Sequence, residues 1–145
     1  MGKNGSIDDA SIRLHSVAIR LLRRARISDR DAAVGPAQLS ALSVLYFAEE
    51  PVAVTALASA EQVAQPTMSR IIGSLAAAGA VSRTSPAGDK RVQLIRISAK
   101  GRRIFEAARE RRLEVVRDVV GRLSPSGLSA LETAMDELAA ALSDS

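Results

Sequence analysis

The side chains best suited to chemistry in this chain are cationic, and they gather in its middle. Residues 65–103 carry eight Lys or Arg and one acid, Asp89, whereas residues 31–64 and 124–145 each carry four acids and no base. A charge run is often only a solvated surface, but positive potential between two acidic flanks suits docking to a polyanion. The distribution therefore favours a nucleic-acid-binding surface in residues 65–103.

The sequence contains few residues of the types that enzymes use for catalysis. It contains no cysteine, a single histidine (His15) and no paired carboxylates in a plausible cleft. Nucleophilic and metal catalysis then lack their usual residues, and a thiolate zinc site or a disulfide scaffold is excluded. We therefore expect a protein that is not an enzyme and that uses neither a cofactor nor a metal.

The sequence also favours a soluble, cytoplasmic protein. No apolar run approaches the roughly 20 residues of a membrane span, and residues 1–9 lack the apolar core of a secretory signal. The absence of cysteine fits a reducing compartment. We expect no membrane partner.

Two short helices are expected to present the polar side chains of the middle region. The first spans 55–61, with Thr55 as its N-cap, and the second spans 65–78, with Gly79 ending it. A turn at 62–64 joins the two helices. The second helix carries apolar residues on one face at helical spacing: Met68, Ile71, Ile72 and Leu75.

A β-hairpin is expected to follow the second helix directly. Residues 81–85 and 91–97 are rich in β-forming side chains. The Pro and Gly within residues 85–90 suit the tip between these strands. Ser98 then caps a long helix that ends near residue 123.

Further helices are expected on both sides, over 8–30 and 36–48 and from 124 onward. Two short helices followed at once by a basic hairpin form a winged helix-turn-helix, in which the second helix enters the major groove of DNA. The chain is therefore predicted to be mainly α with a small β-hairpin (α+β), and residues 36–103 to be the DNA-binding domain.

Five short segments in this order resemble the multiple antibiotic resistance regulator (MarR) family. They are Leu57-Ala58, Pro66-Thr67-Met68-Ser69-Arg70, Gly79-Ala80-Val81-Ser82-Arg83, Asp89-Lys90-Arg91 and Ile97-Ser98-Ala99-Lys100-Gly101. With the flanking helices, the resemblance covers nearly the whole chain. The sequence departs from the family pattern at Gln62, where a Gly is frequent, and at Glu61, where an apolar residue is common. The turn therefore needs Gln62 in a permitted conformation or a slightly longer loop.

The recognition helix supplies one group of candidate DNA contacts. Gln can pair with adenine, Arg with guanine, and Thr can touch a thymine methyl group. The alternative for Arg70 is an ordinary solvent-exposed helix residue. The candidates are Gln65, Pro66, Thr67, Ser69, Arg70 and Ser74.

The hairpin supplies a second group. Asp89 can bond the hairpin backbone, or pair with Arg91 or Arg83, and so hold the wing in shape. A guanidinium at Arg91 is then free to enter a narrow, A·T-rich minor groove. Lys90, Arg83 and Arg96 are expected to contact phosphates, with little effect on sequence choice. The alternative is a hairpin tip with solvated charges.

The terminal helices are expected to form a homodimer. Residues 8–34 and 104–145 have more apolar positions than one small winged domain can cover. A symmetric dimer, as the resemblance implies, would set two recognition helices ~34 Å apart to match a palindromic site. The alternative is a last helix that folds back on its own chain. The apolar stripe of this last helix, which the dimer would cover, consists of Leu128, Leu131, Met135, Leu138 and Leu142.

The resemblance further implies a small, often aromatic or anionic, effector bound between the dimerisation helices and the winged domain. We expect such a ligand to change the spacing of the recognition helices and weaken DNA binding. A lone histidine such as His15 is more often a structural residue than a ligand contact. By position, the candidate residues are His15, Ser43, Tyr46, Phe105 and Arg109.

The function expected from these features is sequence-specific regulation of transcription, as a repressor on double-stranded DNA. The alternative is an architectural winged-helix protein that binds DNA without sequence preference. A preferred binding site would separate the two, because an architectural protein has none.

Overall fold

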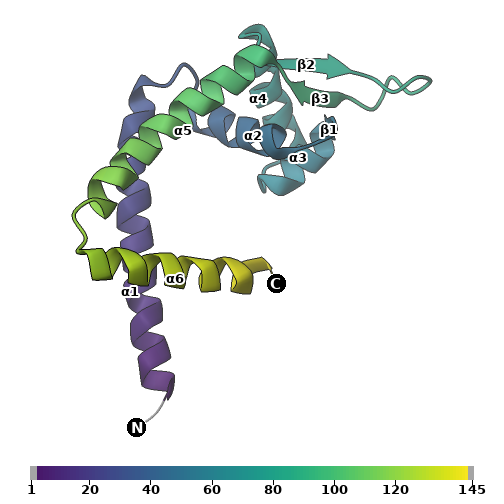
Figure 1. Cartoon of the computed structure of the whole chain (residues 1–145). Coiled ribbons are helices and arrows are strands. Elements are labelled where there is room, and N and C mark those ends of the chain that lie inside the picture. The colour runs from purple at the N-terminus through teal and green to yellow at the C-terminus, as the bar shows by residue number, and fades with distance from the viewer. Residues whose placement is uncertain (1–2, 144–145) are drawn as a thin grey trace. The chain divides into compact units, whose positions relative to one another are not determined.

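The computed structural model describes residues 3–143, which fall into two compact units. The winged unit comprises residues 26–112. The terminal-helix unit comprises the described residues up to Ala25 and from Leu113 onward. The divisions fall inside two long helices, α1 (Lys3–Ile27) and α5 (Ala99–Val120). Figure 1 shows the elements in chain order from purple to yellow.

Three helices form the centre of the winged unit: α2 (Pro36–Phe47), α3 (Val54–Ala60) and α4 (Gln65–Ala77). Their apolar faces meet in one core with side chains from the sheet and from α5. Burial of these apolar side chains is the main stabilising contribution to this unit. The largest fully buried side chains are Leu39, Leu42, Leu57, Met68, Ile72, Leu75 and Ile95.

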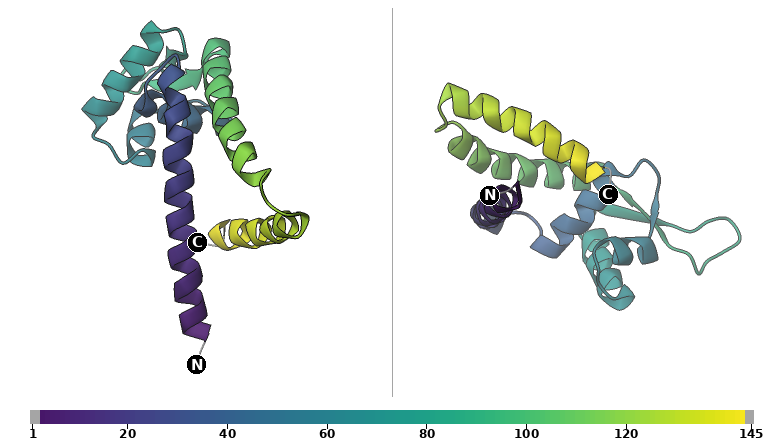
Figure 2. Two further views of the ribbon diagram at one scale, coloured as in Figure 1. Left: turned by 90° about the vertical axis from the view of Figure 1, so that its left-hand side faces the viewer. Right: turned by 90° about the horizontal axis from the view of Figure 1, so that it is seen from below.

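A small antiparallel sheet completes the winged unit, with strand order β1-β3-β2. The hairpin strands are β2 (Val81–Thr84) and β3 (Leu94–Ile97), and β1 (Val52–Ala53) pairs with the other edge of β3. The mainly α fold with a small β-hairpin, predicted from the sequence, is confirmed. Figure 2 shows the hairpin extending beyond the helices of its own unit.

The expected strand over 91–97 was too long at its start. Residues 91–93 lie outside β3, because the Arg91 backbone N–H bonds to the Asp89 side chain rather than to the opposite strand. The Gln93 carbonyl oxygen instead accepts a bond from the Val54 N–H at 3.2 Å. This bond ties the hairpin to the start of α3. The two-residue strand β1 was missed, since so short a segment has no period of its own.

Ser98 caps α5 as predicted, and the residues after it are tightly constrained. Its Oγ accepts the Gly101 N–H at 3.0 Å and donates to the Gly79 carbonyl oxygen at 2.6 Å. A Cβ on Gly101 would lie 2.1 Å from the Ala80 carbonyl oxygen. Only glycine therefore fits at this close approach of α5 to the end of α4.

Helix boundaries differ from the expected ones at several ends. The N-cap of α3 is Ala53, without a side-chain bond, so Thr55 lies inside the helix and is not its cap. The first helix begins at Lys3 and is followed by the 3-10 helix η1 (Ser28–Asp31). The long helix α5 ends at Val120 instead of near 123. Such shifts of a few residues are usual at frayed helix ends.

The terminal-helix unit contains the rest of α1, the end of α5, and α6 (Pro125–Ser143). An ion pair of 3.3 Å joins Arg24 on α1 to Asp118 on α5, and Arg122 contacts the same carboxylate at 2.8 Å. No residue of α6 is buried within residues 125–143. The apolar stripe predicted for this helix is therefore only partly covered by its own chain. Among residues 3–143 no helix combines the length and hydropathy needed to cross a membrane.

Candidate nucleic-acid interface

The turn between α3 and α4 is tight although it contains no glycine. Gln62 adopts φ 53°, in the left-handed region where Gly is frequent. The N–H groups of Gln62 and Val63 bond back to the carbonyl oxygens of Ser59 and Ala58, at 3.2 and 3.0 Å. Glu61, where an apolar residue is common, accepts a hydrogen bond from the Ser40 hydroxyl. The first of the two expected solutions, Gln62 in a permitted conformation, is the one observed.

The polar face of α4 is exposed while its apolar face is fully buried. Met68, Ile72 and Leu75 each have 0% exposure. Thr67 is half-buried, and the other candidates on this helix are exposed. The helix therefore has one side available to a partner. The exposed candidates are Gln65, Pro66, Ser69, Arg70 and Ser74.

Two surface hollows border this exposed side of α4. One, of about 260 Å³, brings together Gln65, Ser69 and Arg91 of the hairpin. The other, of about 370 Å³, is lined by Thr67, Arg70 and Ser74 together with the first residues of α2. Side chains far apart in the sequence thus share one surface, as a winged helix-turn-helix requires.

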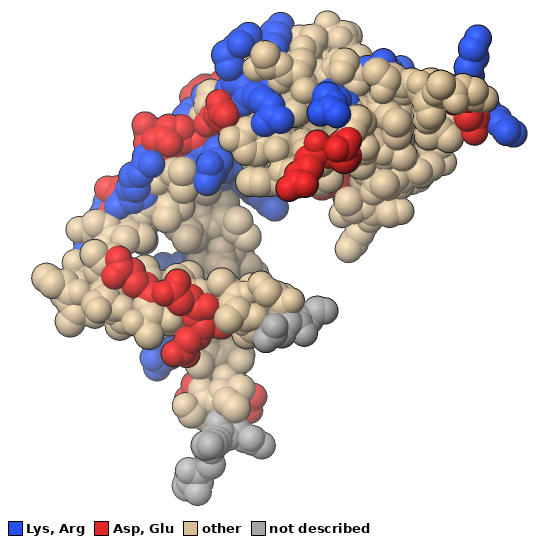
Figure 3. All heavy atoms as spheres, turned by 45° about the vertical axis from the view of Figure 1, so that its right-hand side comes forward, with Lys and Arg blue, Asp and Glu red and all other residues tan. Residues whose placement is uncertain are grey.

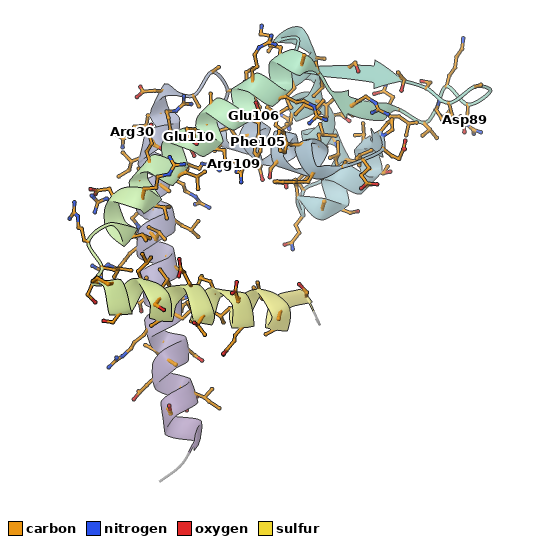
Figure 4. The ribbon with its side chains drawn as sticks, viewed as in Figure 1. Arg30, Asp89, Phe105, Glu106, Arg109 and Glu110 are labelled. Atoms are coloured by element: carbon orange, nitrogen blue, oxygen red, sulfur yellow. The ribbon has the colours of Figure 1, made fainter. Side chains whose placement is uncertain are left out.

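Asp89 organises the hairpin tip by bonding to Arg91. Its Oδ1 accepts the Arg91 backbone N–H at 2.9 Å and lies 3.4 Å from the Arg91 Nε. The Arg91 side chain remains 94% exposed. The carboxylate therefore fixes the backbone of the tip while the guanidinium reaches into solvent. Figure 3 shows cationic atoms projecting at this tip, and Figure 4 labels Asp89 there.

The remaining cations of the hairpin are all exposed. Lys90 follows Asp89, and Arg83 on β2 lies opposite Ile95 of β3. Arg96 on β3 lies 3.9 Å from Glu50, and both side chains are more than half exposed. An exposed pair at this distance adds little stability, so Arg96 stays available to another anion. No sequence pattern pointed to Glu50, because it is far from Arg96 in the chain.

Two of the candidate effector residues meet in an aromatic cluster of the winged unit. The rings of Tyr46 on α2 and Phe105 on α5 have centroids 4.6 Å apart, and Phe47 adds an edge contact of 5.1 Å to Tyr46. Phe47 was not among the predicted residues. Ser43 is half-buried on the same helix α2. His15 belongs to the terminal-helix unit, where it is exposed on α1.

Charged side chains of α5 surround the Tyr46 ring. The Tyr46 hydroxyl donates to Glu106 Oε1 at 3.0 Å, and the Arg102 guanidinium lies 5.4 Å from the ring centroid. This hydrogen bond raises the pKa of Tyr46, with smaller contributions from burial and from the Glu106 charge. Arg109 and Arg102 oppose the rise. Figure 4 labels Phe105, Glu106 and Arg109 on α5.

A partly buried ion pair in the winged unit was not predicted from the sequence. Arg112 on α5 donates from Nε and Nη2 to the two carboxylate oxygens of Asp29 on η1, both at 2.8 Å. The Asp29 side chain is only 5% exposed. The hydrogen bonds to Asp29 raise the pKa of Arg112, against the effect of burial. Two-point geometry of this kind fixes the orientation of both side chains.

Comparisons with known proteins agree with this geometry. A family model described as the MarR family matches residues 34–92. An uncharacterised HTH-type transcriptional regulator of Mycobacterium bovis is 34% identical over 141 residues, covering 94% of this chain and 98% of the relative. A solved MarR family protein from Bacillus stearothermophilus is similar with a TM-score of 0.80 at 22% identity, covering 99% of each chain.

One similar structure was solved with nucleic acid. It is a mutant of S. aureus MepR bound to an oligodeoxyribonucleotide, with a TM-score of 0.69 at 19% identity, covering 92% of this chain and 97% of that one. At this identity the likeness concerns the fold alone. The fold of this chain is therefore one that occurs in a protein bound to an oligodeoxyribonucleotide.

Proposed function

This chain belongs to the MarR family and is a DNA-binding transcriptional regulator with a winged helix-turn-helix, and from that premise we propose that it is a cytoplasmic repressor of a specific operator. It binds a palindromic site as a homodimer, and a small ligand releases it. The observation that carries the proposal is the hairpin tip, where Asp89 holds the backbone and leaves the Arg91 guanidinium free. This side chain lines the same hollow as Gln65 and Ser69 of α4.

The roles within this surface follow from the position of each group. Gln65, Ser69 and Arg70 on the exposed face of α4 read base edges in the major groove. Arg91 enters the adjacent minor groove, where a narrow A·T-rich segment has the most negative potential. Lys90, Arg83 and Arg96 neutralise phosphates and give the binding its salt dependence. These remaining positions complete the surface: Pro66, Thr67, Ser74 and Asp89.

The test begins with selection of bound fragments from genomic DNA by the purified protein. We expect a recurrent site with two-fold symmetry, and neighbouring genes that identify the regulated functions. Binding without any preferred sequence would support the architectural alternative and refute the regulator on a specific operator.

Replacing Arg91 by Ala should then weaken operator binding at least about tenfold at physiological salt, because a minor-groove guanidinium is lost. Lys90→Ala, next to it, should weaken operator and random DNA by similar factors. Arg109→Ala on α5 serves as the control for general charge loss. Equal operator affinity of Arg91→Ala and the wild type, measured by fluorescence anisotropy, would refute this role of Arg91.

The homodimer is supported by the uncovered apolar surface of the terminal-helix unit. Most of the exposed large apolar side chains in residues 3–143 belong to this unit. Exposed apolar patches often mark protein–protein interaction sites, and a second copy of this chain would cover these side chains. The side chains on α6 that contribute most are Leu128, Met135 and Leu142.

A charge placed in the stripe of α6 tests the dimer. Met135→Asp should raise the dissociation constant of the dimer by at least about tenfold, since a buried unpaired charge is costly. Ser129→Asp, on the other side of the same helix, is the matched control. Sedimentation equilibrium measures both. A wild-type chain that is monomeric at micromolar concentration would contradict the dimer.

The effector is proposed to bind beside the aromatic cluster of Tyr46 and Phe105, with Ser43 and Arg109 of the same unit as further contacts. The evidence in its favour is the meeting of aromatic rings and cations at this place. A small phenolic acid at millimolar concentration should lower operator affinity. If several such acids leave the affinity unchanged, this choice of ligand is wrong.

A further inference from the structure

One flank of α5 in the winged unit carries three cations around a small residue. Lys100, Arg103, Ala107 and Arg111 follow one another at spacings of three and four residues, which places them on one side of a helix. Ala107 leaves the space between Arg103 and Arg111 open. The half-buried Ile104 adds an apolar wall.

The opposite wall of this space comes from the segment just before α2. Asp31 and Ala33 line it, and together with the α5 flank they border an open surface hollow of about 400 Å³. We call it the α5 hollow. The two-point ion pair between Asp29 and Arg112 holds η1 against α5. The hollow is therefore a fixed feature of the winged unit, within which all these residues lie.

The cations of the α5 hollow have no partner among residues 3–143. The side chains of Lys100, Arg103 and Arg111 make neither an ion pair nor a hydrogen bond with another described residue. The Arg111 Nε is moreover buried without a hydrogen-bond acceptor. Buried donors are almost always paired in proteins, so an unpaired one calls for a ligand, ion or water as its partner. Because Arg111 lines the hollow, an anion bound there is a possible partner for this side chain.

We propose that the α5 hollow binds a small dianion with an apolar body, such as a dicarboxylate or a phosphate ester. Three cations and the carboxylate of Asp31 leave a local charge of two positive units, which a dianion balances. Guanidinium groups bind carboxylate and phosphate oxygens through two parallel hydrogen bonds. Ile104, Ala107 and Ala33 supply the apolar surface for the body of the ligand. The volume lies within the range of small-molecule sites, about 300–1,000 Å³.

The α5 hollow is distinct from the two surfaces described above. Arg102 and Arg109, beside the Tyr46 ring, lie about half a turn around α5 from Lys100 and Arg111. The hollow shares no residue with those that border the exposed face of α4. Binding at this hollow therefore does not depend on the proposed operator or on the proposed effector crevice.

The first experiment measures binding to the full chain without DNA. Succinate and inorganic phosphate are titrated separately by calorimetry at constant ionic strength, and amide chemical shifts are followed by NMR. We expect saturable binding of one anion per chain, with the largest shifts in residues 31–33 and 100–111. The tighter of the two anions identifies the head group that the site prefers. No saturable binding of either anion up to about 10 mM, where any useful site of this kind is occupied, would overturn the proposal.

Three variants then locate the site. Arg103→Ala removes a cation of the hollow and should weaken binding at least about tenfold, the usual effect of losing a charge-assisted bond. Ala107→Leu keeps every charge and fills the floor, so it should weaken binding by a similar factor. Arg13→Ala removes the same charge from α1, outside every site proposed here, and should change affinity less than about twofold.

The pattern across these variants decides between a site and general electrostatics. Equal losses in Arg103→Ala and Arg13→Ala, with no loss in Ala107→Leu, would overturn the proposal, because only net charge would matter. Circular dichroism confirms that each variant is folded. Arg91→Ala should leave succinate and phosphate binding unchanged, so failure at the operator and failure at the α5 hollow can be told apart.

Discussion

The winged unit and the terminal-helix unit are built from similar apolar residues, yet only one of them buries a core. The winged unit contains seven large side chains with less than 2% exposure. In the terminal-helix unit, α6 has no buried residue at all within residues 125–143. Ala, Leu, Ile and Val at helical spacing occur in both. The difference lies in what faces each apolar stripe, because the chain itself covers the stripes fully only in the winged unit.

The apolar residues of the two units therefore have different roles. Those of the winged unit hold α4 and the hairpin in a fixed relation, so that Gln65, Ser69 and Arg91 share one hollow. Those of the terminal-helix unit stay exposed, as the proposed dimer requires. All three aromatic residues of the sequence lie in the winged unit, which concentrates its spectroscopic signals there.

The comparison is tested most directly by removing one leucine from each unit. Leu75 has 0% exposure, so Leu75→Ala should lower the free energy of unfolding by about 2–5 kcal/mol through lost burial and a cavity. Leu142 is 77% exposed, and in the dissociated chain Leu142→Ala should change the free energy of unfolding of the winged unit by less than about 0.5 kcal/mol. Urea unfolding followed by tyrosine fluorescence measures both, because Tyr46 reports the winged unit. Similar losses from the two substitutions would mean that the terminal helix belongs to the same core.

A smaller effect is expected from the turn of the helix-turn-helix. Gln62 has φ 53°, where a side chain is disfavoured, so Gln62→Gly should raise the free energy of unfolding by up to about 1 kcal/mol. Gln65 begins α4 with ordinary helical geometry, and Gln65→Gly should lower it by up to about 1 kcal/mol. Replacement by glycine is therefore expected to change the free energy of unfolding in opposite directions at positions 62 and 65. A destabilised Gln62→Gly would show that the glutamine side chain makes a compensating contact.

The order of the elements and their exposed faces could be predicted from the sequence, because these depend on local periodicity and on turn residues. Gly79 at φ 74° and the Ser98 cap follow from residue type alone. The pair of Asp29 and Arg112 does not, since its partners are separated by 83 positions and no local pattern links them. The α5 hollow was missed for the same reason: its far wall comes from residues 31–33. Long-range pairing of charges depends on packing that periodicity does not encode.

The finest test of the comparison uses the single tyrosine as a local probe of the winged unit. The hydrogen bond to Glu106 raises the pKa of Tyr46 in the folded chain above that of an unfolded tyrosine, about 10. Absorbance at 295 nm should therefore show a higher titration midpoint for the native protein than for the protein unfolded in guanidinium. Glu106→Ala should bring the native midpoint down, and Arg109→Ala should raise it further, because Arg109 opposes the shift.

The sign of the linked stability follows from the raised pKa. The contribution of Tyr46 is fully present below the pKa of the unfolded chain and is lost as the pH rises through the higher pKa of the folded chain. Urea unfolding between pH 8 and pH 12 should therefore show less alkaline destabilisation in Glu106→Ala, which has less of this contribution to lose, than in the wild type. A native midpoint at or below the unfolded one would show that α2 and α5 do not hold Tyr46 against Glu106. The aromatic cluster would then be no more fixed than the exposed stripe of α6, and the contrast between the two units would weaken at the place proposed for the effector.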